Sequence, residues 1–249
     1  MDLASNIATS RLVAQQRAMD VIAGNIANAD TPGYKATRVL FSDWLDRQDG
    51  ADPPPGGNTI AFTQDRATWR EQAPGPIRRT GNPLDLAITN AGWFSVSTAR
   101  GIRLTRDGRF GLMPDGTVAD AAGDPLLDTT GNPVRIGATD TTLTITADGS
   151  LSSENGQIAR IGIVQPADPM QLAAEGGTLF RADATTTNPV AQPKIVQGAI
   201  EGSNVQPITE LTRMIDNERE FQFVTQMVQA ESDREKDAIE KLLPSGGIS

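Results

Sequence analysis

Hydrophobic and polar positions near the start of the chain follow the period of an α-helix. A heptad register places a mostly apolar seam at Ser5, Ala8, Leu12, Gln15, Met19, Ile22 and Ile26. Ile7, Val13 and Val21 widen this seam into a broad apolar face. Pro32 disfavours helix at the residue before it and stops the helix. We therefore predict a helix over about residues 3–29.

A second helical pattern occupies the other end of the chain. Its periodic positions are Leu211, Met214, Phe221, Val224, Val228, Glu235, Ile239 and Leu242. Ser203 or Asn204 is the expected N-cap, and Pro207 suits the first turn. Residues 205–243 hold nine acidic and five basic side chains, so this segment carries 5 − 9 = −4. We predict a long acidic helix over about residues 205–243.

Between the helices, from about residue 76 to residue 190, the period changes to two. Leu84, Leu86 and Ile88 alternate with other residues, as do Phe94 with Val96 and Ile161 with Ile163. The turn signals between these runs are Asp107-Gly108, Asp115-Gly116, Asp148-Gly149 and Asn155-Gly156. This pattern predicts an antiparallel all-β domain built from hairpins.

Residues 36–75 are expected to connect the first helix to the β domain. The apolar cluster at 39–45 (VLFSDWL) is interpreted as a short helix. Residues 52–57 (DPPPGG) must form a loop, since Pro and Gly break regular structure. Residues 60–62 and 68–70 are interpreted as short extended pieces.

The fold class that follows is α+β, with long N- and C-terminal helices that bracket an inserted antiparallel all-β domain. We expect residues 1–34 and 200–243 to form a helical coiled-coil domain, residues 35–75 to connect, and residues 76–199 to form the β domain. Two arrangements of the helices remain open. Either the two seams pair with each other, or both helices lie flat on the β domain as covering elements.

The composition argues against several classes of function. The net charge is −9 and basic residues form only isolated pairs such as Arg78-Arg79, which argues against nucleic acid binding. Cys and His are absent, so disulfides, Cys metal sites and His general bases are excluded. The carboxylates show no convergent pair, and phosphate-binding glycine loops are missing. We therefore expect no enzyme activity, no cofactor and no metal.

Membrane insertion is not expected, because no apolar run approaches the ~20 residues that cross a bilayer. The first residues, Met1-Asp2-Leu3-Ala4, lack the basic and apolar regions of a cleaved signal peptide. If the protein leaves the cytoplasm, we expect it to do so without such a peptide.

Four segments resemble a known family. They are residues 25–35 (NIANADTPGYK), 80–88 (TGNPLDLAI) followed by 92–96 (GWFSV), 105–110 (TRDGRF) and 197–205 (QGAIEGSNV). Together they are similar to signatures of the flagellar rod, hook and hook-associated axial proteins. Gly24 stands where this family usually has Asn, and Leu104 stands where it usually has Tyr. The segments lie near both ends and in the middle, so the resemblance covers nearly the whole chain.

The resemblance implies a structural subunit of the flagellar basal-body rod, which crosses the periplasm and transmits torque from motor to hook. Residues 65–68, 75–76 and 175–180 resemble the proximal-rod type most closely. The implied partners are copies of the chain itself, other flagellar rod proteins and the flagellar type III export apparatus. The alternatives are a distal-rod or hook-type axial subunit and, in a different class, an oligomeric β-domain module that binds cell-wall glycan.

The same resemblance implies a subunit interface along both terminal helices. The candidate residues are Leu12, Met19, Ile22, Asn25, Ile26, Asn28, Tyr34, Asn204, Val205, Leu211, Met214, Ile215, Phe221, Val224 and Val228. Asn25 and Asn28 lie three apart on one helix face and have two possible roles, which are capping of the last carbonyls or contact with a neighbouring subunit. We also expect residues 1–30 and about 205–249 to be mobile in the free monomer.

Within the β domain, structural roles are expected for the conspicuous residues. Gly81, Gly92 and Gly108 suit turns or bulges. Trp93 and Phe94 suit the β core. Arg103, Arg106 and Arg109 are expected on a solvated hairpin face, with contact to an acidic neighbouring subunit as the alternative.

Overall fold

The structure is a computed structural model of the 249-residue chain and describes residues 3–47, 59–168, 172–182 and 187–242. The fold is α+β, with a helix at each end of the chain and an antiparallel β-rich middle, as predicted. The chain forms two compact units. The helical unit comprises residues 1–26, 37–69 and 207–249, and the β unit comprises residues 27–36 and 70–206.

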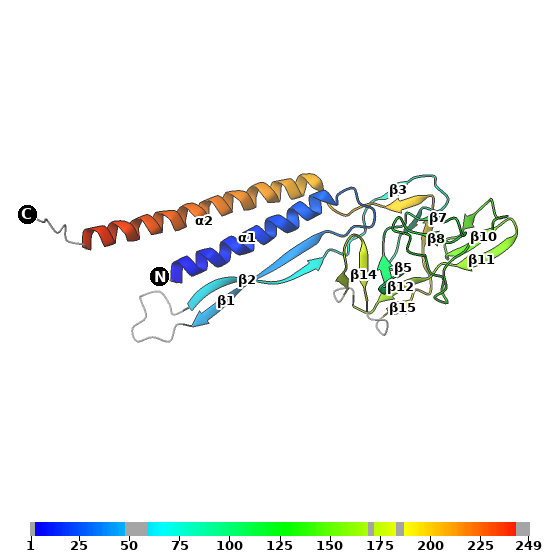
Figure 1. The fold of residues 1–249 in the computed structure, drawn as a ribbon, viewed down its shortest axis with the longest axis horizontal. Coiled ribbons are helices and arrows are strands. Elements are labelled where there is room, and N and C mark those ends of the chain that lie inside the picture. The colour runs from blue at the N-terminus through cyan, green and yellow to red at the C-terminus, as the bar shows by residue number, and fades with distance from the viewer. Residues whose placement is uncertain (1–2, 48–58, 169–171, 183–186, 243–249) are drawn as a thin grey trace, which may run out of the picture. The chain divides into compact units, whose positions relative to one another are not determined.

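The helical unit contains α1 (Leu3–Ala27), α2 (Pro207–Leu242) and a hairpin of β1 (Thr37–Arg47) and β2 (Thr59–Arg70). Both helix predictions are confirmed to within two residues. The two helices lie side by side and run in opposite directions (Figure 1). Their contacts show the same direction, because Gln15 bonds Glu220 while Asn25, further along α1, bonds Glu210. None of the described helices combines the length and the apolar character that a membrane span requires.

The interpretation of residues 39–45 as a helix is wrong, because they lie within strand β1. The cluster holds Val39, Phe41 and Trp44, residue types that favour strands, and it pairs with a second long strand. The extended pieces predicted at 60–62 and 68–70 belong to that single strand, β2. The loop predicted at residues 52–57 lies outside the described residues.

Fifteen short strands lie in the described part of the β unit. They are β3 (Ile77–Arg79), β4 (Leu86–Ile88), β5 (Trp93–Thr98), β6 (Gly101–Thr105), β7 (Gly111–Leu112), β8 (Val118–Ala119), β9 (Thr144–Ile145), β10 (Ser150–Ser153), β11 (Gly156–Arg160), β12 (Ile163–Pro166), β13 (Ala173–Ala174), β14 (Leu179–Arg181), β15 (Thr187–Pro189), β16 (Ile195–Gln197) and β17 (Ala199–Glu201). The largest sheet has the order β13-β14-β6-β5-β12-β15, and each described pairing in it is antiparallel.

Alternation along β5 divides the core of the β unit between the two faces of this sheet. Phe94 and Val96 belong to the main apolar cluster, which includes Leu86, Leu126 and Ile161. Trp93 points to the opposite face, as successive strand residues do, and packs with Leu104 and Phe180. Trp93 and Phe94 are therefore core residues, as predicted.

The hairpin predictions are mostly confirmed. Asp115-Gly116 joins β7 to β8, Asp148-Gly149 joins β9 to β10, and Asn155-Gly156 joins β10 to β11. Asp107-Gly108 does not close a hairpin. Gly108 instead lies against Leu86, where an added Cβ would sit 1.6 Å from the Leu86 carbonyl oxygen. This glycine is required by a close approach between two backbones.

The unit boundaries differ from the expected ones. Residues 35–75 do not form one connecting region, because the β1–β2 hairpin joins the helical unit while the flanking residues join the β unit. The physical reason is a set of hydrogen bonds around residues 201–204. The Gly33 N–H donates to the Glu201 carbonyl at 2.8 Å, and the Ala36 N–H donates to Asn204 Oδ1 at 2.7 Å.

Neither predicted N-cap residue caps α2, since the helix begins at Pro207. The Asn204 side chain instead donates to the Glu71 and Ala73 carbonyls at 2.9 and 3.0 Å. Ser203 Oγ accepts the Val205 N–H at 3.2 Å. Both side chains therefore order the strand-to-helix connection. Pro207 occupies the first turn, as predicted.

Candidate subunit interface

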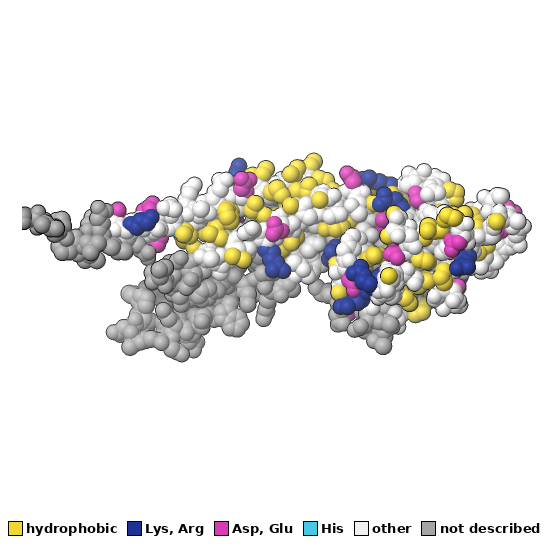
Figure 2. Space-filling model, viewed as in Figure 1, with side chains coloured by type: hydrophobic (Ala, Val, Ile, Leu, Met, Phe, Trp, Pro, Cys, Tyr) yellow, Lys and Arg dark blue, Asp and Glu magenta, His cyan; other side chains and the backbone are white. Residues whose placement is uncertain are grey.

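Helix α2 exposes a series of large apolar side chains to solvent (Figure 2). Ile208, Leu211 and Ile215 are spaced by three and four residues and form one stripe. Phe223 and Met227, four residues apart, form a second. Ile208 is 82% exposed and Phe223 is 69% exposed. These two groups, five residues in all, are together called the outer α2 stripe.

The opposite face of α2 turns toward α1. Val224 is only 5% exposed, and Met214, Phe221 and Val228 are half-buried. Asn217, on the same face, donates to the Gln15 carbonyl of α1 at 2.8 Å. The six residues predicted on this helix therefore divide between two faces. Leu211 and Ile215 face solvent, while Met214, Phe221, Val224 and Val228 pack inside the helical unit.

On α1 the predicted seam also turns inward. Ala8, Ala14 and Gln15 are buried, and the seam residues Leu12, Met19, Ile22 and Ile26 are half-buried. Val13 is exposed and lines a groove with Gln16, Arg17, Asp20, Val21 and Thr68. The outer face of α1 is accordingly mostly polar, whereas the outer face of α2 is apolar.

Asn25 is fully buried, so it presents no surface to a neighbouring subunit, and it does not cap the helix end. Its side chain donates to the Thr37 carbonyl at 2.9 Å and accepts the Thr37 N–H at 2.8 Å. It also donates to Glu210 at 3.1 Å, and Glu210 forms 2.7 Å ion pairs with Arg38 and Arg213. Asn25 thus joins α1, β1 and α2.

The other polar and aromatic candidates also have contacts within their own chain. Asn28 lies just beyond the end of α1, where its side chain accepts the Thr31 hydroxyl at 3.2 Å. Tyr34 and Val205 are buried together with Ala36. Tyr34, Asn204 and Val205 therefore contribute to the fold of the β unit, while Asn28 is half-buried.

The sequence analysis missed a buried charge cluster, Lys35–Glu201–Arg106. Lys35 Nζ lies 2.6 Å from Glu201 Oε1, and Arg106 Nη1 lies 3.0 Å from Glu201 Oε2. Glu201 also accepts the Gly75 N–H at 3.0 Å. Lys35 donates to the Ala73 carbonyl at 2.9 Å. Burial lowers the pKa of both Lys35 and Arg106, and the Glu201 charge opposes this change.

Three of the four family-like segments meet at this cluster. Lys35 ends the first, Arg106 lies in the third and Glu201 lies in the fourth. Gly33, with φ of +69°, brings the first segment so close to Arg106 that a Cβ would lie 2.3 Å from the Arg106 carbonyl carbon. The sequence offered one signal for this cluster, which is a charged residue in each of the three segments. Spacing alone does not indicate that these charges pair.

The expected solvated face of three arginines is wrong for two of them. Arg103 is buried and pairs with Glu175 at 2.9 Å, and Arg106 is buried in the cluster above. Only Arg109 is exposed, and it pairs with Asp107 at 3.5 Å. Each of the three arginines therefore pairs with a carboxylate of its own chain.

A groove of about 470 Å³ lies beside strands β5, β6 and β12. Its side chains include Ile102, Leu104, Leu127, Val164 and Pro189. Polar side chains, among them Asp128, Thr129, Arg181 and Thr187, also line the groove.

Comparison with known proteins gives consistent similarities. Family models described as "Flagella basal body rod protein", "Flagellar hook protein FlgE/F/G D1 domain" and "Flagellar basal body rod FlgEFG protein C-terminal" match residues 4–35, 87–153 and 196–240. The flagellar basal-body rod protein FlgF of Caulobacter vibrioides is 35% identical over 246 residues, which cover 97% of this chain and 98% of the relative. FlgF of Mesorhizobium japonicum is 33% identical, with 95% and 96% covered. FlgG of Agrobacterium fabrum is 30% identical, with 89% and 92% covered.

Proposed function

Because this chain belongs to the flagellar basal-body rod protein family, it is a structural subunit of the bacterial flagellar rod, and we propose that it occupies the proximal rod. The FlgF relatives support this position, since they match 95–97% of the chain at 31–35% identity. In this position the subunit forms part of the drive shaft that transmits torque from motor to hook.

The outer α2 stripe carries the proposal for how the subunit assembles. Its large apolar side chains are exposed although they lie on a regular helix. Burying one such side chain stabilises a contact by about 1.5–3 kcal/mol. Helices of neighbouring subunits pack against this stripe and bury it from outside. On its other side α2 shares a unit with α1 and the β1–β2 hairpin of the same chain. The half-buried seam residues then lie in a core shared between subunits, as in a coiled coil.

Rod growth follows from the geometry of such contacts. The outer stripe and the inward face of α2 differ, so a contact between two copies need not be two-fold symmetric. Heterologous contacts that do not close into a ring generate helical tubes. The partners in this assembly are copies of the chain and the adjacent rod proteins. The type III export apparatus is the proposed delivery route, in which the largely unfolded chain passes without a cleaved signal peptide.

Two adjacent residues test this proposal. Phe223→Asp places a charge on the outer stripe and leaves the contacts within the chain unchanged, so the β unit should stay folded while self-association weakens at least tenfold, which corresponds to about 1.4 kcal/mol. Val224→Asp places the same charge against α1 and should lower the helix content of the chain itself. Circular dichroism reports folding, and sedimentation reports association. Normal assembly of the Phe223→Asp protein would count against the outer stripe as an interface.

A distal-rod position is the second candidate, because FlgG relatives match at 30% and 32% identity. Electron microscopy of isolated basal bodies that carry a labelled copy of this chain distinguishes the two positions. Label at the motor-proximal end of the rod supports the proximal assignment, and label along the hook-proximal part supports the distal one.

A further inference from the structure

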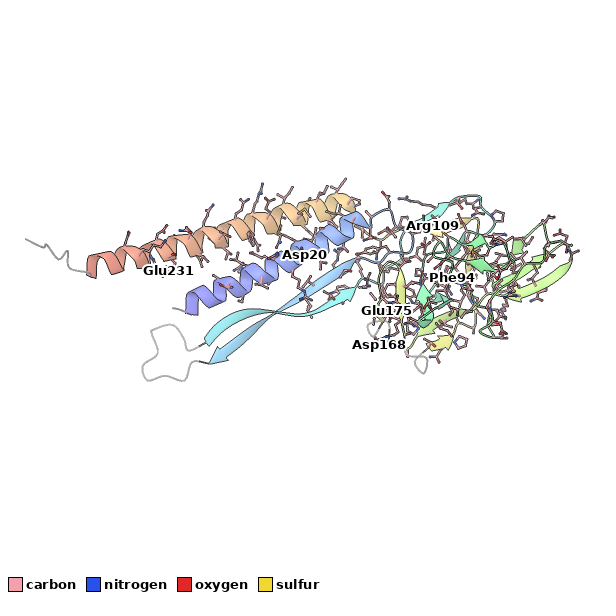
Figure 3. The ribbon with its side chains drawn as sticks, viewed as in Figure 1. Asp20, Phe94, Arg109, Asp168, Glu175 and Glu231 are labelled. Carbon is pink, nitrogen blue, oxygen red and sulfur yellow. The ribbon has the colours of Figure 1, made fainter. Side chains whose placement is uncertain are left out.

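The face of α1 that turns away from α2 carries a groove. We call it the α1 groove, and its described lining residues are Val13, Gln16, Arg17, Asp20, Val21 and Thr68. It measures about 460 Å³, and its apolar members are Val13 and Val21. Arg17 already interacts within its own chain, whereas Asp20, which Figure 3 labels on α1, is exposed. The groove therefore offers apolar contact beside a negative charge.

Gly24 continues this face of α1 by one more turn. It lies four residues after Asp20, and helix positions four apart share a face. A Cβ built at Gly24 would meet no described atom of the chain within 4 Å. Glycine weakens a helix relative to alanine, and its advantage is that another molecule can come close to the backbone. Gly24 therefore leaves a space beside Asp20, which we call the Gly24 notch.

The outer α2 stripe contains one basic residue among its apolar side chains. Arg219 is exposed and lies four residues from both Ile215 and Phe223, so it shares their side of the helix. Asp216 lies three residues before it in sequence. Within the described part of the chain, neither Arg219 nor Asp20 forms an ion pair within 4 Å. The stripe and the groove thus hold opposite charges that their own chain leaves unpaired.

We propose that the outer α2 stripe of one subunit packs into the α1 groove of a second copy, with Arg219 against Asp20 and Ile215 in the Gly24 notch. The two helices run in opposite directions within a chain, so copies that share one orientation place α2 of one antiparallel to α1 of the next. Asp20 precedes Gly24 by four residues, and Arg219 follows Ile215 by four. An antiparallel pair therefore makes both contacts in one register.

This contact uses surfaces that the pairing of α1 with α2 inside one chain leaves uncovered. The internal pairing runs through Gln15 and Asn25 of α1, which bond Glu220 and Glu210 of α2. Because the stripe and the groove are different surfaces, each copy can use both, and the contact repeats from copy to copy. The inference rests on the proposed self-assembly and names the surface that receives the stripe.

A charge swap provides the first test. Asp20→Arg and Arg219→Asp should each weaken self-association of the full-length chain about tenfold, because each replaces attraction by repulsion. The variant with both changes should return to within about threefold of the unaltered chain. Asp20→Arg combined with Arg234→Asp is the control, since Arg234 is exposed, the net charge is the same and Arg219 is kept, so it should stay weak. Sedimentation at low salt compares the variants. Failure of the swap to restore association, or recovery of the control, would overturn the pairing.

The Gly24 notch provides the second test. Gly24→Gln should keep or raise the helix content seen by circular dichroism, because Gln forms helices better than Gly and meets no described atom here. It should nevertheless weaken association about tenfold, since its side chain fills the space of Ile215. Ala23→Gln is the matched control, because Ala23 is exposed and is turned about 100° away around the helix. Equal association of these two variants would contradict the contact at the notch.

The outcomes separate this inference from the proposed function. Association that Phe223→Asp weakens, but that the changes at Asp20 and Gly24 leave intact, would show that the stripe binds another surface. That result overturns the inference and leaves the proposed assembly standing. An unaltered chain that does not associate with itself overturns the contact between copies, and the position of labelled chain in basal bodies then tests the rod assignment on its own.

Discussion

At the scale of single residues, the Glu201 carboxylate is the point on which the β unit depends most. It is fully buried and accepts hydrogen bonds from Lys35, Arg106 and the Gly75 backbone. A buried ion cluster adds little net stability over an apolar one, but removing one partner leaves uncompensated charge. The cluster therefore specifies how three distant segments join.

Glu201→Gln should destabilise the protein by about 3–5 kcal/mol, since Lys35 and Arg106 would remain as two buried cations without a counter-charge. Urea unfolding followed by tryptophan fluorescence measures the change. Arg160→Gln is the control, because its pair with Asp148 is exposed and spans 3.8 Å, so a loss of at most about 1 kcal/mol is expected. Equal losses in the two variants would contradict the role given to Glu201.

Glycine 108 gives a second residue-scale prediction. A Cβ at this position would lie 1.6 Å from the Leu86 carbonyl oxygen, which neither backbone can accommodate in place. Gly108→Ala should cost about 3 kcal/mol or more, as overpacking of a tight contact does. Gly111→Ala, where nothing lies within 4 Å of the added carbon, should be nearly neutral. Thermal unfolding of both variants compares them directly.

At the scale of elements, the corner of the β9–β11 sheet depends on an ionised Glu154. Its carboxylate accepts the Thr141 and Thr142 N–H groups and the Thr141 hydroxyl at 2.8–2.9 Å. These bonds depress its pKa from 4.5 to about 2. The stabilisation is therefore fully present above pH 4.5 and is lost as the pH falls from 4.5 toward 2.

An NMR titration of the Glu154 carboxyl carbon should show this midpoint near 2. Glu154→Gln should reduce the acid-induced loss of stability between pH 4.5 and 2, because the amide does not titrate. Retention of the full acid dependence in this variant would show that other carboxylates are responsible.

Elements also show how far the sequence predicts this fold. The helices and hairpins were predictable because each has a local signal, which is a period of 3.6 residues, or a period of two with an Asp-Gly or Asn-Gly turn. Strand β1 was not, since a short cluster such as Val39–Leu45 has no clear period and its long partner β2 decides its conformation. The contacts of Glu201 with Lys35 and of Asn25 with Glu210 were likewise not predictable, because the partners lie 166 and 185 residues apart in sequence.

At the scale of the whole molecule, the two units differ in how much apolar surface they bury. Each described apolar cluster lies in the β unit, and the largest contains fourteen buried residues. In the described part of the helical unit the buried apolar side chains are Ala8, Ala14 and Val224. The described side chains of α1 and α2 thus bury little apolar surface completely, which offsets little of the entropy cost of ordering the helices, about 1–2 kcal/mol per residue.

This difference leads to a prediction about concentration. In dilute monomer, amide hydrogens of α1 and α2 should exchange rapidly, while those of β5, β6 and β12 should stay protected. In assembled protein, the helices should gain protection and the β unit should change little, because association stabilises only the state that binds neighbours. Hydrogen exchange with mass spectrometry at concentrations below and above assembly makes the comparison. Full protection of both helices in monomer would mean that the helical unit completes its core alone, and the outer α2 stripe would then have no part in ordering it.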